Sequence, residues 1–210
     1  MIDFEEIKKY LPQYLSTTLQ DRLFDELKKF PQNIDQRIYS TYLAKNETIY
    51  QGDGIEGLMV VNLPDPTIKP ASSMVLSNIC DIYSFHVRYF PSRIVYAPIF
   101  NLEKYKRTIT NEFEIDPDVT LDKIEDHIKA IKRQFVTQIF YLPKGARLQQ
   151  DSIVFLDRLN NCPVESLSAE KIKERKIFTL SDYGFYLFLI KLSIHFTRVR
   201  EELERKIPEC

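Results

Sequence analysis

The chain has 210 residues, of which 44% are hydrophobic and 28% charged, with 29 basic side chains against 30 acidic ones. This composition is typical of an ordinary globular protein and excludes a disordered or fibrous chain. The net charge of -1 excludes a uniformly basic nucleic-acid coat but leaves a local basic face open. The length allows one large domain, and we predict a single domain over 1–210.

Cysteine usage and the apolar runs predict the compartment. The three cysteines, Cys80, Cys162 and Cys210, are widely spaced and form no Cys-x-x-Cys pair, which favours thiols in a reducing cytoplasm over a metal site or disulfides. The N-terminus lacks the basic start and apolar stretch of a signal peptide. The most apolar run, 185–190, is far shorter than the roughly 20 residues of a membrane span. We therefore expect a cytoplasmic protein without membrane contact.

The N-terminal segment, 1–45, is predicted to be helical. Apolar residues recur at helical spacing from Phe4 to Phe30, with a break at Pro12, which indicates two short helices that pack one face inward. The segment 46–106 is predicted to be a β-rich core.

The β-rich core opens with three glycines between 52 and 57, which indicate a turn between strands. Three short runs rich in apolar and β-branched residues, at 58–63, 74–77 and 93–97, predict strands. We expect the second and third runs to be neighbouring buried strands, because two apolar runs joined by a polar connection have few other ways to bury both faces.

The segment 107–119 is polar and without a period, and is interpreted as a loop. Thr120 has the character of a helix N-cap, and Leu121, Ile124, Ile128, Ile131 and Phe135 follow along one side of the helix it would begin. Further strand signals lie at 136–142, 152–156 and 176–180, so that 120–180 is expected to hold a helix and additional strands.

A long helix is predicted to close the chain at 181–206, with Ser181 as its N-cap. Its first half is apolar on nearly every side, which is typical of a buried helix. We expect the N-terminal helices to pack on it, and any apolar surface left over to meet a second chain.

Four phrases in 50–101 occur in the order and at the spacing found in the PemK/MazF-type toxins. They are Gly52-Asp53, Val61-Asn-Leu-Pro-Asp-Pro66, Met74-Val-Leu-Ser-Asn78 and Val95-Tyr-Ala-Pro-Ile99. The chain thus resembles that family, which consists of small SH3-like barrels that cut RNA. The resemblance implies an α+β fold: a PemK/MazF-like SH3-type β-barrel with an N-terminal helical pair, a middle helix and a long C-terminal helix.

The catalytic positions of the family are altered in this chain. Where the family has an arginine that stabilises charge on the scissile phosphate, this chain has Ala71, and only Lys69 offers a cation after a small shift. Where the family has a hydroxyl residue, this chain has Phe100, whose ring cannot bind phosphate or transfer a proton. The resemblance therefore favours a barrel that is kept while its RNase chemistry is lost or rebuilt.

A second phrase, Leu76-Ser-Asn-Ile-Cys-Asp-Ile82, resembles one in bacterial proteins found near phage-defence and other conflict systems. If an RNase survives, Lys69 and Arg93 would supply charge to a phosphate, Asp81 would be the general base and Ser77 would lie beside them. Their side chains should then converge on one cleft.

Two further groups are candidate binding residues. Asn78 and Cys80 follow a predicted strand end, where binding residues often lie; alternatively they form a hydrogen-bonded turn with Cys80 buried. Lys104, Tyr105 and Arg107 form a basic and aromatic cluster that either follows a phosphate backbone or is a solvated surface. His127, on the polar side of the helix after Thr120, is interpreted as a solvated histidine.

The leading prediction is a non-catalytic interaction component of a bacterial conflict or phage-defence module. Its partner would be another protein or a second copy of the chain, since the toxins it resembles are dimeric. The alternatives are an endoribonuclease of PemK/MazF type with a rebuilt active site, and a protein that binds RNA or DNA without cleaving it. No cofactor and no metal are expected.

Overall fold

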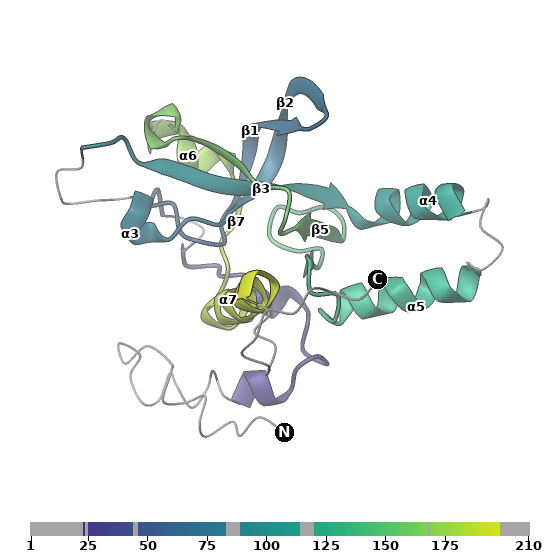
Figure 1. Ribbon diagram of the computed structural model, residues 1–210. Helices are drawn as coiled ribbons and strands as arrows, with labels where there is room; N and C mark the ends of the chain where they lie inside the picture. The colour runs from purple at the N-terminus through teal and green to yellow at the C-terminus, as the bar shows by residue number, and fades with distance from the viewer. Residues whose placement is uncertain are drawn as a thin grey trace, which may run out of the picture.

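The computed structural model of the chain describes residues 23, 25–43, 46–82, 89–113, 120–167 and 169–197. In these residues a sheet of seven antiparallel strands is combined with α-helices and short 3-10 helices, which confirms the α+β class (Figure 1). The predicted N-terminal helical pair lies almost wholly outside the described residues, and so does the charged end of the C-terminal helix after 197.

Three long strands form the centre of the sheet, and each overlaps a predicted run, β2 only at its last two residues. They are β1 (Gly54–Asn62), β2 (Asp65–Val75) and β3 (Arg93–Asn101). Met74 pairs with Ala97 and Val75 with Tyr96, and all four side chains are buried. The expectation that these two runs are neighbouring buried strands is confirmed.

The four other strands extend the sheet on both sides. They are β4 (Ile139–Leu142), β5 (Ser152–Phe155), β6 (Asn160–Pro163) and β7 (Lys176–Phe178). The hydrogen-bonded order is β4-β5-β3-β2-β1-β7, and β6 also pairs with β3. The described strands therefore form an open sheet that ends on β4 and β7. They do not form the closed barrel that the resemblance implied.

Strands β5 and β6 follow the same edge of β3 in succession. Phe100 pairs with Ile153, and Ile94 pairs with Cys162. The three residues 157–159 are exposed and bulge out between the two strands, because the pairing with β3 shifts by three residues from β5 to β6. This bulge lies beside the β1–β2 hairpin: the amide of Val61 donates to Asn160 Oδ1 at 2.9 Å.

Helix α4 (Leu102–Phe113) corrects the prediction of a loop for 107–113, and the rest of that predicted loop, 114–119, lies outside the described residues. Its buried residues Leu102 and Ile109 lie seven apart, and the half-buried Tyr105 lies between them. These apolar residues begin at Leu102, so the segment 107–119 taken alone contains too few of them to indicate a helix. Helix α4 lies beside α5 (Leu121–Lys132), and the two project together from one end of the sheet (Figure 1).

The predicted start of α5 is confirmed. Thr120 Oγ1 accepts a hydrogen bond from the amide of Lys123 at 3.3 Å, and Ile124, Ile128 and Ile131 are buried. Leu121 and Phe135 were expected on the same side but are exposed. Phe135 falls beyond the helix end, where the backbone of Gln134 has a φ of 62° and turns the chain.

Helix α7 (Asp182–Thr197) begins as predicted at Ser181, whose Oγ accepts from the amide of Gly184 at 3.2 Å. Its first half contributes Tyr183, Leu187 and Phe188 to the largest core cluster. Leu23 and Leu27 belong to the same cluster, so the described end of the N-terminal segment packs on α7 as expected. Ile190 and Ile194, in the second half of α7, are partly exposed. The described part of the chain therefore does not bury this helix on every side.

The remaining helices are short and were not predicted: α3 (Ile79–Ile82), α6 (Ala169–Arg175), and the 3-10 turns η1 (Gln36–Ile38) and η3 (Val164–Ser166). None of the helices in the described ranges has the length and hydropathy needed to span a bilayer.

Candidate functional site

A cavity of about 460 Å³ lies at the end of β2, where the sequence placed a binding site. Asn78 and Cys80 both line it, together with Gln51, Asp182 and Tyr186. Asn78 Oδ1 accepts from the amide of Cys80 at 2.9 Å, which is the hydrogen-bonded turn expected from the sequence. Cys80 is exposed, whereas that turn was expected to bury it.

Ser77 lies outside this cavity's lining and has a structural role. Its Oγ accepts from the amide of Val95 at 2.7 Å, and its own amide donates to the Val95 carbonyl at 3.3 Å. Both bonds join the end of β2 to β3. The backbone of Asp81 forms part of α3, and its side chain is not among the parts of the chain that the structure describes.

The strand register separates the two predicted phosphate-binding cations. Lys69 pairs with Val60 in the outer part of the hairpin. Ser77 lies eight residues further along the chain, roughly 26 Å away at 3.3 Å per residue of extended strand. Arg93 lies at the Ser77 end and donates from Nε to Asn161 Oδ1 at 2.6 Å. Lys69 therefore shares no cleft with Ser77 and Arg93.

Tyr105, predicted as a binding residue of the basic cluster, is the centre of a contact network at the α4–α5 end of the sheet. Its hydroxyl lies 3.0 Å from His127 Nε2, and its ring packs edge-on against Phe155 at 5.7 Å between centroids. The Arg158 guanidinium lies 4.1 Å from the Phe155 ring centroid and 5.1 Å from that of Phe100. We call Phe100, Tyr105, His127, Phe155 and Arg158 the aromatic cluster.

Burial sets the protonation of this cluster. It lowers the pKa of His127, which favours the neutral imidazole at neutral pH, and it raises the pKa of the Tyr105 hydroxyl. Lys104 and Arg107 lie on the same helix and are exposed. The amide of Lys104 donates to Asn101 Oδ1 at 2.8 Å, so that Asn101 caps the start of α4.

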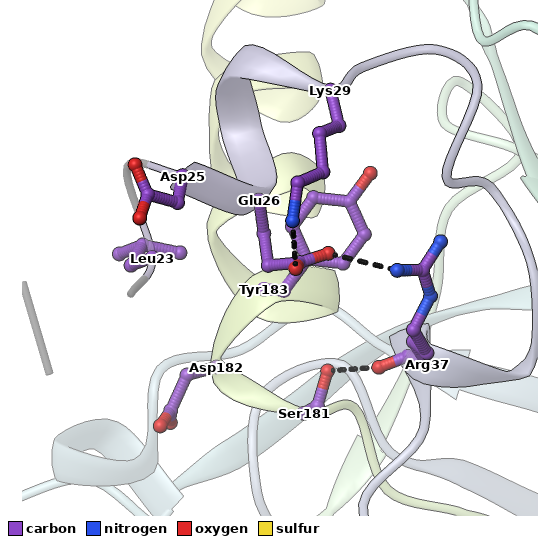
Figure 2. Close-up of a pocket in the computed structure, with 8 residues that line it drawn as sticks. All are labelled: Leu23, Asp25, Glu26, Lys29, Arg37, Ser181, Asp182 and Tyr183. Atoms are coloured by element: carbon purple, nitrogen blue, oxygen red, sulfur yellow. Dashed lines mark hydrogen bonds and ion pairs between the residues drawn. The ribbon is translucent and has the colours of Figure 1, made fainter. Parts of the chain in front are cut away.

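A second cavity, of about 530 Å³, lies where the N-terminal segment meets α7 (Figure 2). Glu26 accepts from Lys29 at 3.0 Å and from Arg37 at 3.2 Å, and Ser181 Oγ donates to the Arg37 carbonyl at 2.6 Å. The hydrogen bond from Asn33, followed by that from Lys29, lowers the pKa of Glu26. The bond from Ser181 joins the N-terminal segment to the start of α7, and the two Glu26 contacts hold that segment together. The polar groups of this cavity therefore have a structural role.

Asp53 of the Gly52-Asp53 phrase is fully buried and has a structural role. Its Oδ2 accepts from the Tyr50 amide at 2.9 Å and lies 3.0 Å from Lys176 Nζ of β7. Lys176 is buried too, and donates to the Thr48 carbonyl at 2.8 Å. The pair fixes the turn before β1 against the last strand of the sheet.

An apolar surface covers the outer part of the β1–β2 hairpin and the bulge beside it. Met59, Leu63, Ile68 and Leu159 are 52%, 76%, 62% and 47% exposed. Met59 pairs with Pro70, and Ile68 lies two residues from Pro70 on the same strand, so these three share a face. Leu63 and Leu159 border one cavity of about 460 Å³. We call these four exposed residues the hairpin surface.

The edges of the hairpin are blocked against pairing with a further strand. On β1, the Met59 carbonyl accepts from Tyr96 at 2.5 Å and the Glu56 carbonyl from Arg175 at 2.8 Å. On β2, Pro66 and Pro70 have no amide to donate. A partner would therefore dock against the side chains of the hairpin surface rather than extend the sheet.

Comparison of the chain with protein-family models found no family that matches, and comparison with curated proteins found no match either.

The hairpin surface was not predicted from the sequence, and neither were three members of the aromatic cluster: His127, Phe155 and Arg158. His127 was interpreted as solvated, because its neighbours in sequence are charged; its contact with Tyr105 comes from another helix. Arg158 lies in the bulge, which carries no periodic signal. The turn phrase Leu63-Pro-Asp-Pro66, with an apolar residue at its tip, was the one available sign of the hairpin surface.

Proposed function

We propose that this chain is a non-catalytic, PemK/MazF-like interaction component of a bacterial conflict or phage-defence module, and that the hairpin surface binds a second copy of the chain. The four ordered sequence phrases support the family resemblance. The observation that carries the binding function is the presence of three large, exposed apolar side chains on the β1–β2 hairpin and a fourth, Leu159, on the bulge beside it. The hairpin projects from the body of the molecule (Figure 1). Exposed large apolar side chains that lie on neighbouring segments are typical of protein interfaces.

The chemistry of the hairpin favours a second copy as the partner. The toxins that the chain resembles are dimeric, and the hairpin surface offers an apolar face of the kind that a second copy could cover. A two-fold interface brings the same patch of both copies together, so that the apolar side chains of one hairpin surface would meet those of the other. The blocked strand edges limit this contact to side chains, which suits a discrete dimer rather than an extended sheet.

The distribution of the predicted catalytic residues supports the non-catalytic part of the proposal. Lys69 lies in the outer hairpin, and the Ser77 hydroxyl is engaged by β3. A phosphate needs several cations or donors within hydrogen-bond distance at once. The family's arrangement is therefore not available at these positions.

Replacing Ile68 with glutamate tests the interface. The Ile68→Glu variant should remain monomeric at concentrations where the unmodified protein associates, because a charge in an apolar contact must be desolvated. Leu121→Glu is the matched control, since Leu121 is similarly exposed, on α5. Sedimentation velocity should show association for the control and none for Ile68→Glu. Equal association of both variants would remove the hairpin surface as the interface.

A second function, RNA cleavage by a rebuilt site, is favoured by one specific contact. Tyr105 and His127 are in hydrogen-bond distance, and Arg158 lies on the adjoining Phe155 ring. A neutral His127 can accept the proton of a 2′-hydroxyl, Arg158 can pair with the phosphate, and the half-buried Phe100 can stack on a base. We hold this as the alternative to the interaction module.

The His127→Asn variant separates the two functions. If the aromatic cluster cleaves RNA, this change should slow cleavage of a fluorescent oligoribonucleotide about 10²- to 10⁴-fold, which is the contribution of a general base. His195→Asn, on α7, should leave the rate unchanged. Absence of cleavage by the unmodified protein, or an unchanged rate in His127→Asn, would reject the alternative.

A further inference from the structure

An apolar cavity of about 280 Å³ lies between α7, the end of α5 and the N-terminal segment. Its lining is almost wholly apolar and includes Leu27, Phe30 and Leu187. Phe135, Ile190 and Ile194 also line it and are each about half exposed, so they form its mouth. The volume is close to the lower end of ligand pockets, roughly 300–1,000 Å³, which limits an occupant to a small molecule.

One amine contributes to this lining. Lys191 is 6% exposed, and its Nζ donates to the Gln134 carbonyl at 2.6 Å and to Gln134 Oε1 at 3.3 Å. Gln134 is itself fixed, since its side-chain amide exchanges two hydrogen bonds with the backbone of Tyr141 at 2.7 and 3.0 Å. The position of the amine is thus set by a rigid neighbour.

The protonation state of the Lys191 amine follows from its buried surroundings. Burial lowers the pKa of Lys191 to about 7, so an appreciable fraction is neutral at neutral pH. A neutral amine has two N–H bonds and one lone pair. The two Gln134 oxygens accept the two N–H bonds, which leaves the lone pair for an electrophile. Desolvated lysines in apolar pockets are the ones that form Schiff bases.

We propose that Lys191 is a carbonyl-reactive lysine, which forms a reversible imine with a small apolar aldehyde bound in this cavity. The Lys191 lone pair attacks the carbonyl carbon and forms the C–N bond. The carbonyl oxygen takes two protons, both from the amine nitrogen, and leaves as one molecule of water. No oxidant or reductant is required, and water reverses the reaction. This site is separate from the hairpin surface and does not depend on the proposed interaction function.

Reductive trapping tests the proposal on the full chain. The protein is treated at pH 7 with hexanal and cyanoborohydride, which reduces any imine to a stable amine, and adducts are located by peptide mass mapping. Lys191 should be labelled at least about a hundredfold faster than exposed lysines such as Lys129, whose amines are almost wholly protonated at this pH. It should also be labelled faster than the N-terminal amine, which is the reference for an accessible group of pKa about 8.

Three controls make the result specific. Lys191→Arg should abolish the rapid adduct, and Ile194→Trp, which narrows the mouth, should slow it without changing labelling elsewhere. Glyceraldehyde, a polar aldehyde, should show no preference for Lys191. The proposal would be overturned if hexanal labelled Lys191 no faster than the exposed lysines, or labelled the N-terminal amine but not Lys191. It would also be overturned if glyceraldehyde labelled Lys191 with the same preference as hexanal.

Discussion

The Lys176→Met variant should lose about 3–5 kcal/mol of unfolding free energy, because it leaves the buried Asp53 carboxylate without its counter-charge. Burial raises the pKa of Asp53, and Lys176 is the largest influence that opposes this rise. Removing the lysine also leaves the Thr48 carbonyl without a donor. Chemical denaturation of the variant and of the unmodified protein measures the difference.

Two further variants show whether the loss comes from the unpaired charge. Asp53→Leu combined with Lys176→Met should recover much of the stability, since a buried pair replaced by apolar side chains is often neutral. Lys129→Met, which removes the exposed pair with Asp126, should leave the denaturation midpoint nearly unchanged. A Lys176→Met variant as stable as Lys129→Met would mean that the buried pair does not hold β7 to the turn before β1.

The Gly184→Ala variant should lose about 2–3 kcal/mol. A Cβ at this position would lie 2.2 Å from the Ile38 carbonyl oxygen, which accepts the amide of Ser181 and thus fixes the start of α7. Overpacking of this kind costs typically 1–3 kcal/mol, and here the opposing atom belongs to the backbone and cannot rotate away. The measurement is the free energy of unfolding from urea titration.

A gain in stability in the Gly184→Ala variant would contradict this explanation. An alanine within a helix is favoured over glycine by about 1 kcal/mol when nothing obstructs it. A Gly184→Ala protein that is more stable than the unmodified one would therefore show that α7 does not approach η1 as closely as described.

The buried parts of the fold were predictable from the sequence. The runs that gave β2, β3 and β5 are apolar because both of their faces are covered, and the caps Thr120 and Ser181 are polar residues directly before apolar helices. The parts missed are those whose pattern is polar. The first half of β2 is exposed, and β6 reads Asn-Asn-Cys-Pro. Its strand conformation comes from pairing with β3, which no local propensity signals.

The candidate sites were harder to predict from the sequence, because they depend on strand register and on contacts between segments that are distant in the chain. Asn78 and Cys80 could be singled out from the sequence because their position after a strand end is a local property, and the structure places both in the lining of a cavity. The separation of Lys69 from Arg93 follows only from the strand pairing. The approach of His127 to Tyr105, 22 residues apart, requires that α4 and α5 pack together.

Molar mass in solution tests the central claim most directly. Light scattering on the unmodified 210-residue chain, across a concentration series at physiological salt, should show a mass that rises from the monomer value of 24.9 kDa toward twice that value. The Ile68→Glu variant should stay at the monomer mass over the same range. A constant 24.9 kDa for the unmodified chain at every concentration would contradict the claim that the hairpin surface binds a second copy.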